Sequence, residues 1–82
     1  MNPRVKNVKP LEDFKLEIEF ENGEKKLFDV SPFLTISKFT ELRNDNLFKS
    51  VVPYLGSIQW SNGLDLCPDI LYEDGVQYNT GN

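Results

Sequence analysis

The sequence predicts a small α+β domain, in which two hairpins and an N-terminal strand form an antiparallel sheet and one or two short helices pack on one face of it. Three observations support this class. One segment alternates apolar and charged residues, two Asn-Gly pairs each separate two strand-like segments, and two apolar segments begin with residues that cap helices. Because a chain of 82 residues forms a thin hydrophobic core, large apolar residues are assigned to structure before function.

Residues 14–21 form the clearest predicted strand, because apolar and charged side chains alternate strictly along them. The apolar face consists of Phe14, Leu16, Ile18 and Phe20. Asn22-Gly23 is the pair of residues that most readily adopts positive φ in a tight turn. Residues 24–30 are therefore expected to return as the second strand of a hairpin.

The register of this hairpin depends on the length of its loop. A three-residue loop over 21–23 would place Phe28 and Val30 on the apolar face, with Phe28 beside Leu16. A two-residue loop would instead bring Leu27 onto that face. We prefer the three-residue loop, because it buries more apolar surface.

A short strand containing Val5 and Val8 is predicted before the hairpin, and its basic residues suit the edge of a sheet. These basic residues are Arg4, Lys6 and Lys9. Two helix starts follow the hairpin. Ser31 is expected to cap a helix that has Pro32 in its first turn. Asp45 is expected to cap a second helix, which would contain Leu47, Phe48, Val51 and Val52 and end at Pro53.

The second hairpin is predicted over residues 57–67, around Asn62-Gly63. Its sequence resembles that of the first hairpin, which fits either an internal duplication or two independent hairpins with the same favoured turn. Residues 68–72 are expected to pack Ile70 or Leu71, together with Tyr72, back on the sheet. We therefore expect one domain over residues 1–72 and a flexible C-terminal tail over 73–82.

Charge is distributed unevenly along the chain, whose net charge is −4. Residues 1–49 are balanced, whereas the segment from Ser50 onward has four acidic residues and no Lys or Arg. This balance makes nucleic acid an improbable main partner, because phosphate backbones are held by clustered basic residues. The basic residues of the first strand are interpreted as a solvated edge.

The composition also limits the chemistry. The chain has no His and a single cysteine, Cys67, so neither an imidazole-activated nucleophile nor a zinc cluster can be assembled. No glycine-rich phosphate-binding motif occurs, and no cofactor is expected. Cys67 lies between two apolar residues and is expected to be a buried, inert thiol. Without an apolar leader or membrane-spanning segment, the chain is expected to act in the cytoplasm, away from the membrane.

Acidic residues near the single tryptophan define the candidate site. Asp65 and Asp69 would form a polar patch around Trp60 as an aromatic anchor, or Asp69 would be a turn residue and Trp60 part of the core. Glutamates at alternate positions of the first hairpin are interpreted as its solvent-facing side: Glu17, Glu19 and Glu21. The candidate interaction surface is Trp60, Asn62, Asp65, Asp69 and Tyr72.

One segment carries a family resemblance: Ile58-x-Trp60-x-Asn62-Gly63-x-Asp65-Leu66-x-Pro68-Asp69-x-Leu71-Tyr72. Together with Pro-Arg-Val-Lys at the N-terminus and Phe-Glu-Asn-Gly in the first hairpin, it resembles the short bacterial family known as domain of unknown function 2442. The resemblance runs from about Pro3 to Tyr72. It implies a small α+β domain without established catalytic residues. In many members this domain is one half of a two-gene cassette, for which a toxin-antitoxin role has been inferred.

We therefore expect a non-catalytic protein-interaction module, in the role of an antitoxin-like member of such a pair, with a small protein partner and with homodimerisation as a further option. One alternative is a DNA-binding transcriptional regulator, whose contacts would come from Arg4, Lys6, Lys9, Lys25 and Lys26. Some members of the family carry a C-terminal helix-turn-helix, for which the residues after Tyr72 leave no room. The other alternative is a carboxylate-based enzyme built on Asp65 or Asp69.

Overall fold

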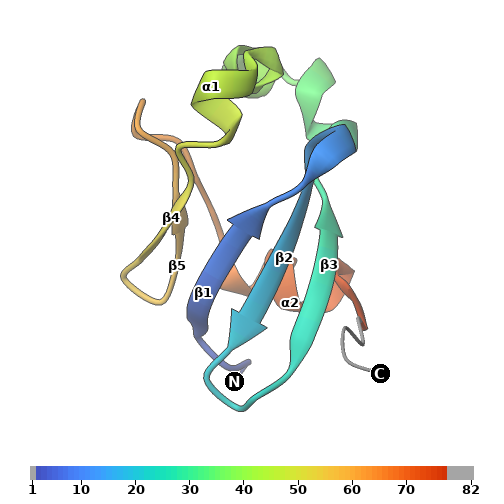
Figure 1. Ribbon diagram of the computed structural model, residues 1–82, viewed down its shortest axis with the longest axis vertical. Coiled ribbons are helices and arrows are strands. Elements are labelled where there is room, and N and C mark those ends of the chain that lie inside the picture. Colours follow the sequence, from blue (N-terminus) through green and yellow to red (C-terminus); the bar gives the residue numbers. More distant parts are fainter. Residues whose placement is uncertain (1, 78–82) are drawn as a thin grey trace.

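Two antiparallel sheets carry the strands of the protein (Figure 1). The computed structural model describes residues 2–77. Its strands are β1 (Val5–Pro10), β2 (Lys15–Phe20), β3 (Lys25–Asp29), β4 (Val52–Tyr54), β5 (Ser57–Gln59), β6 (Asp65–Leu66) and β7 (Val76–Gln77). Its helical segments are the 3-10 helices η1 (Glu12–Phe14), η2 (Ser31–Thr35) and η3 (Ser37–Arg43) and the α-helices α1 (Asp45–Phe48) and α2 (Pro68–Asp74). The predicted α+β class is confirmed.

The two hairpins belong to different sheets, which corrects the expectation of one shared sheet. The four-stranded sheet has the order β1-β2-β3-β7, and the three-stranded sheet has the order β4-β5-β6. Strand β5 finds its neighbour locally, because a reversal at Leu55-Gly56 folds β4 directly onto it. The edge of β1 meets the small sheet through a backbone bond from the Val5 N–H to the Gly56 carbonyl, 2.9 Å long.

The first hairpin has the register preferred from its apolar face. Leu16 pairs with Phe28, and Gly23 has a φ of 92°, as a three-residue loop requires. The strand begins at Lys15 rather than Phe14, because Asp13 and Phe14 adopt left-handed φ values of 61° and 58° in the turn from β1. Even so, the Phe14 carbonyl accepts a hydrogen bond from the Val30 N–H, so the pairing continues past the end of β2.

The second hairpin repeats the loop of the first. Gly63 has a φ of 91°, and the Asn62 side-chain oxygen accepts the N–H of Leu64, just as the Asn22 oxygen accepts the N–H of Glu24. In each loop the asparagine thus satisfies a backbone donor that the turn leaves free.

The helix starts lie one residue earlier than predicted. Val30 rather than Ser31 occupies the N-cap of η2, and the Ser31 N–H donates to the Asp29 carboxylate. Asn44 rather than Asp45 caps α1, since its side-chain oxygen accepts the Leu47 N–H at 3.1 Å.

Helix α1 is also shorter than the apolar spacing suggested. It ends at Phe48, and Val52 lies in β4 together with Pro53. Two adjacent β-branched residues favour a strand, and an edge strand tolerates a proline. The apolar spacing of this segment therefore reflected packing in two successive elements instead of one helix.

The C-terminal segment extends the domain beyond the predicted boundary at Tyr72. Glu73 and Asp74 belong to α2, and β7 pairs with β3. Leu71 is fully buried, whereas Ile70 is exposed. The predicted tail therefore begins too early, and its residues 78–82 lie outside the described part of the chain.

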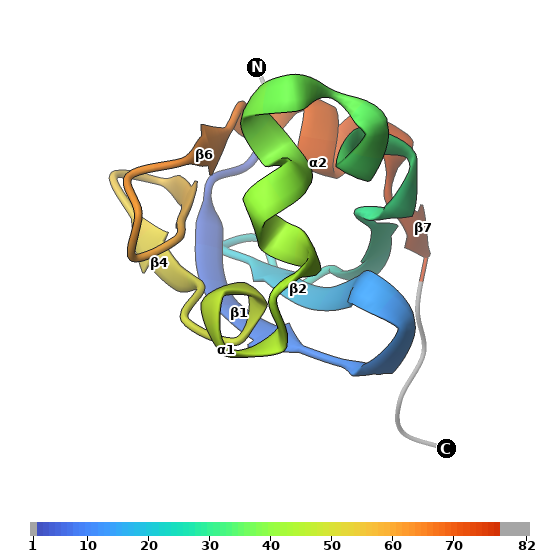
Figure 2. The ribbon, with the colours of Figure 1, turned by 90° about the horizontal axis from the view of Figure 1, so that it is seen from above.

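The hydrophobic core lies between the sheets and the helical segments. Figure 1 shows η2, η3 and α1 gathered at one end of the four-stranded sheet, and Figure 2 shows α2 on one side of it. Trp60 and Phe48 are almost completely buried, and the Trp60 Nε1–H donates to the Phe48 carbonyl at 3.1 Å. The Phe48 ring also contacts Phe14 edge-on, with centroids 5.4 Å apart. This chain of aromatic residues connects the small sheet, α1 and the β1–β2 turn.

We expect Trp60→Phe to lower the free energy of unfolding by about 1–3 kcal/mol, because it leaves the buried Phe48 carbonyl without its donor and removes core volume. Urea titration followed by far-UV circular dichroism measures the loss. Tyr54→Phe, at an exposed aromatic residue, is the control and should change stability little. Equal stabilities for Trp60→Phe and the wild type would contradict this role for the tryptophan.

Candidate functional site

The sequence-predicted interaction surface is not one surface. Trp60 is 1% exposed, so its assignment as a surface anchor is wrong. Its ring fills the core and its only donor is already used by Phe48. Asn62 is exposed, but its amide is engaged with the Glu41 carboxylate at 2.9 Å and with its own turn. The assignment failed for Trp60 because a tryptophan in so small a domain is needed for packing.

The two predicted residues on α2 have structural contacts of their own. Asp69 is exposed and accepts a hydrogen bond from the Asn2 amide at 3.1 Å; this amide also donates to Glu73. Tyr72 is half-buried and lies edge-on against Phe20, with ring centroids 5.1 Å apart. These contacts bind α2 to the N-terminal segment and to the first hairpin.

Tyr72 is further held by two charged residues of the first hairpin. Lys26 places its Nζ 3.7 Å from the centre of the Tyr72 ring and donates to the Tyr72 backbone carbonyl. The Tyr72 hydroxyl donates to the Glu24 carboxylate, which also accepts the Asn22 amide. The pKa of Glu24 is lowered, mainly by the hydrogen bond from the Tyr72 hydroxyl and next by the one from the Asn22 amide. The same Tyr72–Glu24 hydrogen bond raises the pKa of Tyr72.

Asp65 is exposed on β6 and belongs to a different group of residues. Val52 pairs with Gln59, and Gln59 pairs with Asp65, so the three side chains form one row across the small sheet. Ile58 and Leu66, which alternate with them, are buried. The row is therefore on the solvent-facing side of the sheet.

We call this side the outer face; it consists of Val52, Tyr54, Gln59 and Asp65, with Leu55 at its tip. Tyr54 follows Val52 at the strand period of two and is 47% exposed. Cys67 continues β6 with an extended backbone, and alternation places it on the side of Asp65. Cys67 is exposed, which corrects the expectation of a buried thiol. Its two apolar neighbours suggested burial, but Leu66 faces the opposite side of the strand and Pro68 already belongs to α2.

Leu55 is the most unusual residue of the outer face. Its side chain is 77% exposed, and its φ of 49° lies in the left-handed region, which leucine rarely adopts. Leu55 and Gly56 both have positive φ, as in the two-residue turns that usually contain Asn-Gly. The Arg4 guanidinium donates to the Leu55 carbonyl at 3.1 Å and helps to hold the turn. Sequence reasoning missed Leu55, although a glycine between two short apolar segments is a turn signal.

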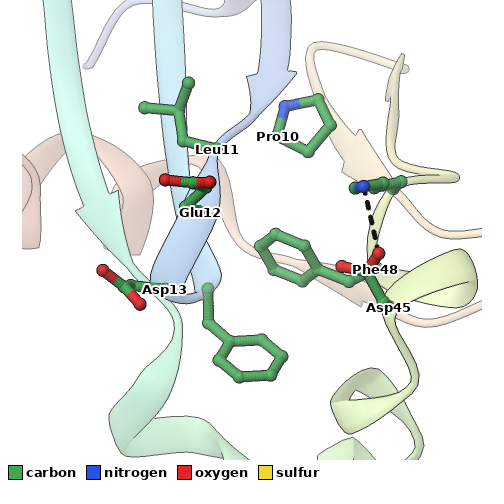
Figure 3. A pocket seen from close by; sticks show the side chains of 8 residues that line it. Pro10, Leu11, Glu12, Asp13, Asp45 and Phe48 are labelled. Carbon is green, nitrogen blue, oxygen red and sulfur yellow. Dashed lines mark ion pairs between the residues drawn. The ribbon is translucent and has the colours of Figure 1, made fainter.

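A groove of about 750 Å³ lies between the β1–β2 connection and α1 (Figure 3). Its lining residues are Pro10, Leu11, Glu12, Asp13, Phe14, Asp45, Phe48 and Lys49. The carboxylates of its rim are exposed, and the Lys49 Nζ pairs with Asp45 at 3.0 Å. Neither Asp65 nor Asp69 lines this groove. The groove thus does not bring the predicted acidic residues together.

Metal binding finds no support in residues 2–77, where no group of three or more His, Cys, Asp or Glu side chains is placed to hold a metal ion. In the same part of the chain, no helix has the length and apolar character needed to cross a membrane. The outer face offers apolar side chains and one carboxylate, that of Asp65, for contact with another surface.

Replacing Leu55 with Asn should raise the free energy of unfolding by about 1 kcal/mol, because asparagine tolerates the left-handed region. Gly56→Ala should lower it by a similar amount, because its φ is 82° and an added Cβ would come within 2.6 Å of the Arg4 guanidinium. Thermal and urea unfolding of both variants measure the effects. Stabilisation by Gly56→Ala, or loss of stability in Leu55→Asn, would show that the turn is not strained.

The Tyr72–Glu24 bond should give stability a defined pH dependence. Because the pKa of Glu24 is lowered on folding, the ionised Glu24 adds to the free energy of unfolding at pH values above its ordinary pKa of 4.5. This stabilisation is lost as the pH falls through the folded-state pKa. The raised pKa of Tyr72 means that its contribution is present below the ordinary value of 10.0 and is lost as the pH rises through the folded-state pKa.

The stability difference between the wild type and Tyr72→Phe should therefore be largest between these limits and shrink toward both ends, as urea unfolding across pH can measure. Glu24→Gln keeps an oxygen that can accept the Tyr72 hydroxyl but cannot be protonated in this pH range. In this background the stability difference should no longer shrink at low pH, while its decrease at high pH should remain. A difference that is constant from pH 3 to pH 11 would contradict the bond's role.

The comparison with known families gives one match. Residues 5–77 match the family described as Protein of unknown function (DUF2442). No curated protein and no solved structure shows a significant match. The match covers both sheets and α2, and thus includes the outer face. The chain belongs to the DUF2442 family, a family of unknown function.

Proposed function

We propose that the protein is a non-catalytic binding module of the cytoplasm whose outer face receives a small protein partner. One observation carries the proposal: Leu55 is both highly exposed and held in a left-handed conformation. This position weakens the fold, and the side chain gains no burial in return. Leu55 combines a strained backbone with an exposed apolar side chain, and both are accounted for if another molecule buries that side chain.

The neighbours of Leu55 support a protein partner. Val52 is 51% exposed and Tyr54 is 47% exposed, so apolar surface is concentrated at β4. Asp65 adds a negative charge at the other side of the sheet. An apolar patch bordered by an acidic group fits a partner surface with apolar and basic residues.

The neighbouring gene product of a two-gene cassette is the partner that we propose, with this chain as the antitoxin-like member. The two alternatives have less support. Of the basic residues that would contact DNA in a transcriptional regulator, Arg4 is engaged with the Leu55 carbonyl and Lys26 with Tyr72. For an enzyme, Asp65 and Asp69 are exposed on different elements, and neither lines the groove beside α1.

Co-expression of the two genes, followed by calorimetric titration of the purified proteins, tests the proposal. We expect a complex at micromolar concentration and about tenfold or more weaker binding for Leu55→Asn and for Tyr54→Ala, because both remove apolar contact area. Leu55→Asn is the sharper variant, since it should weaken binding while it stabilises the free protein.

Two matched controls separate binding from folding. Asp13→Gly relieves a left-handed residue in a different loop, and Asp69→Asn neutralises an acid on α2; both should bind like the wild type. The absence of any complex at micromolar concentration would overturn the proposal. Equal loss of binding in the variants and the controls would do the same for the outer face.

A further inference from the structure

We infer that the partner occupies the outer face with one amphipathic α-helix, which lies across the small sheet and places a Lys or Arg opposite Asp65. This inference rests on the proposed function, which it makes more specific. It follows from three properties of the small sheet: its edges, its dimensions and its charge.

The edges of the small sheet do not favour the addition of a partner strand. The two-residue turn at Leu55-Gly56 closes on the pair Tyr54 and Ser57, which exchange backbone hydrogen bonds, so the next residue of β4 directs its backbone outward. That residue is Pro53, which has no N–H. The central outward position of β4 therefore has no donor for an additional strand, and β4 also lies alongside β1, which further restricts access to this strand.

The opposite edge is equally restricted. Strand β6 contains Asp65 and Leu66, and α2 begins at Pro68. Leu66 pairs with Ile58 on the inside, and its carbonyl also accepts the Ser57 hydroxyl. A partner strand would thus find a single outward peptide group at Asp65, too few for a stable ladder.

The dimensions of the outer face fit one helix. Three strands about 4.8 Å apart span roughly 10 Å, and the three residues of β4 span roughly 10 Å in the other direction. An α-helix with its side chains has a diameter of about 10–12 Å. A helix across the strands would cover Tyr54 and Val52 with its apolar side and continue to β6.

The charge of the surface defines the polar side of that helix. Asp65 ends the row that begins at Val52, and the chain from Ser50 onward contains no Lys or Arg that could neutralise it locally. Asp65 makes no ion pair within the described residues. A basic side chain of the helix would therefore meet an unpaired carboxylate, at a position set by the width of the sheet.

The single cysteine offers a direct test on the complex with the neighbouring gene product. Cys67 lies beside Asp65, so a helix on the outer face should slow its alkylation by iodoacetamide about tenfold or more at saturating partner. In a Cys67→Ser chain, a cysteine placed at Lys25 on β3 should react equally fast with and without partner. Pro53→Val restores an outward N–H without altering the outer face and should leave the dissociation constant within about twofold.

The partner supplies the second measurement. An alanine scan of the partner should find positions that weaken binding spaced by three and four residues, as expected for a helix. Asp65→Lys should weaken binding about tenfold or more, and exchange of the facing basic residue for Glu should restore it.

The outcomes separate the two levels of inference. A complex that leaves Cys67 fully reactive would overturn the helix on the outer face. Tighter binding by Pro53→Val, or sensitive partner positions at every second residue, would overturn it in favour of strand addition. The absence of a complex with the wild-type chain would instead overturn the proposed function itself.

Discussion

The hydrogen bond from the buried Trp60 indole to the Phe48 carbonyl connects the parts of this fold that share no strand. The small sheet meets the large one at β1, where β4 lies alongside that strand and the Val5 N–H donates to the Gly56 carbonyl. Trp60 extends from the small sheet to the end of α1, and the Phe48 ring continues to Phe14 in the β1–β2 turn. Core packing and the contact of β4 with β1 together decide where the small sheet lies, and with it the direction in which the outer face points.

The two halves of the chain are variations of one arrangement. In each, a strand precedes an Asn-Gly hairpin, and an Asp-x-x-Pro segment, residues 29–32 or 65–68, leads into a helix. Strand β3 has five residues and carries the pairing of the large sheet onward to β7, whereas β6 has two residues and stops at Pro68. Because the second half is short, its sheet is covered on only one side, and its other side faces solvent.

Two residues of β4 and its turn are not those that stability alone would favour. An asparagine at position 55 would suit the left-handed backbone, and a residue with an N–H at position 53 would complete the edge of the strand. The chain instead has a leucine at the tip, which adds apolar surface, and a proline at the edge, which discourages uncontrolled strand pairing. Both residues agree with the proposed role of the outer face, since the leucine offers contact area to a partner and the proline limits aggregation.

Local patterns were sufficient to predict the α+β class, both hairpins and the register of the first, because strict alternation and Asn-Gly turns act over a few residues. They were insufficient for the end of α1 at Phe48, for the split into two sheets and for the continuation to Gln77, since these depend on contacts between residues distant in the chain. The candidate site shows the same division. Asp65 could be recognised as exposed and acidic, but only the tertiary structure decided that Trp60 is buried, that Tyr72 holds α2, and that Val52, Tyr54 and Leu55 face solvent beside Asp65. Burial is a property of the whole packed chain, and a residue's neighbours in sequence do not determine it.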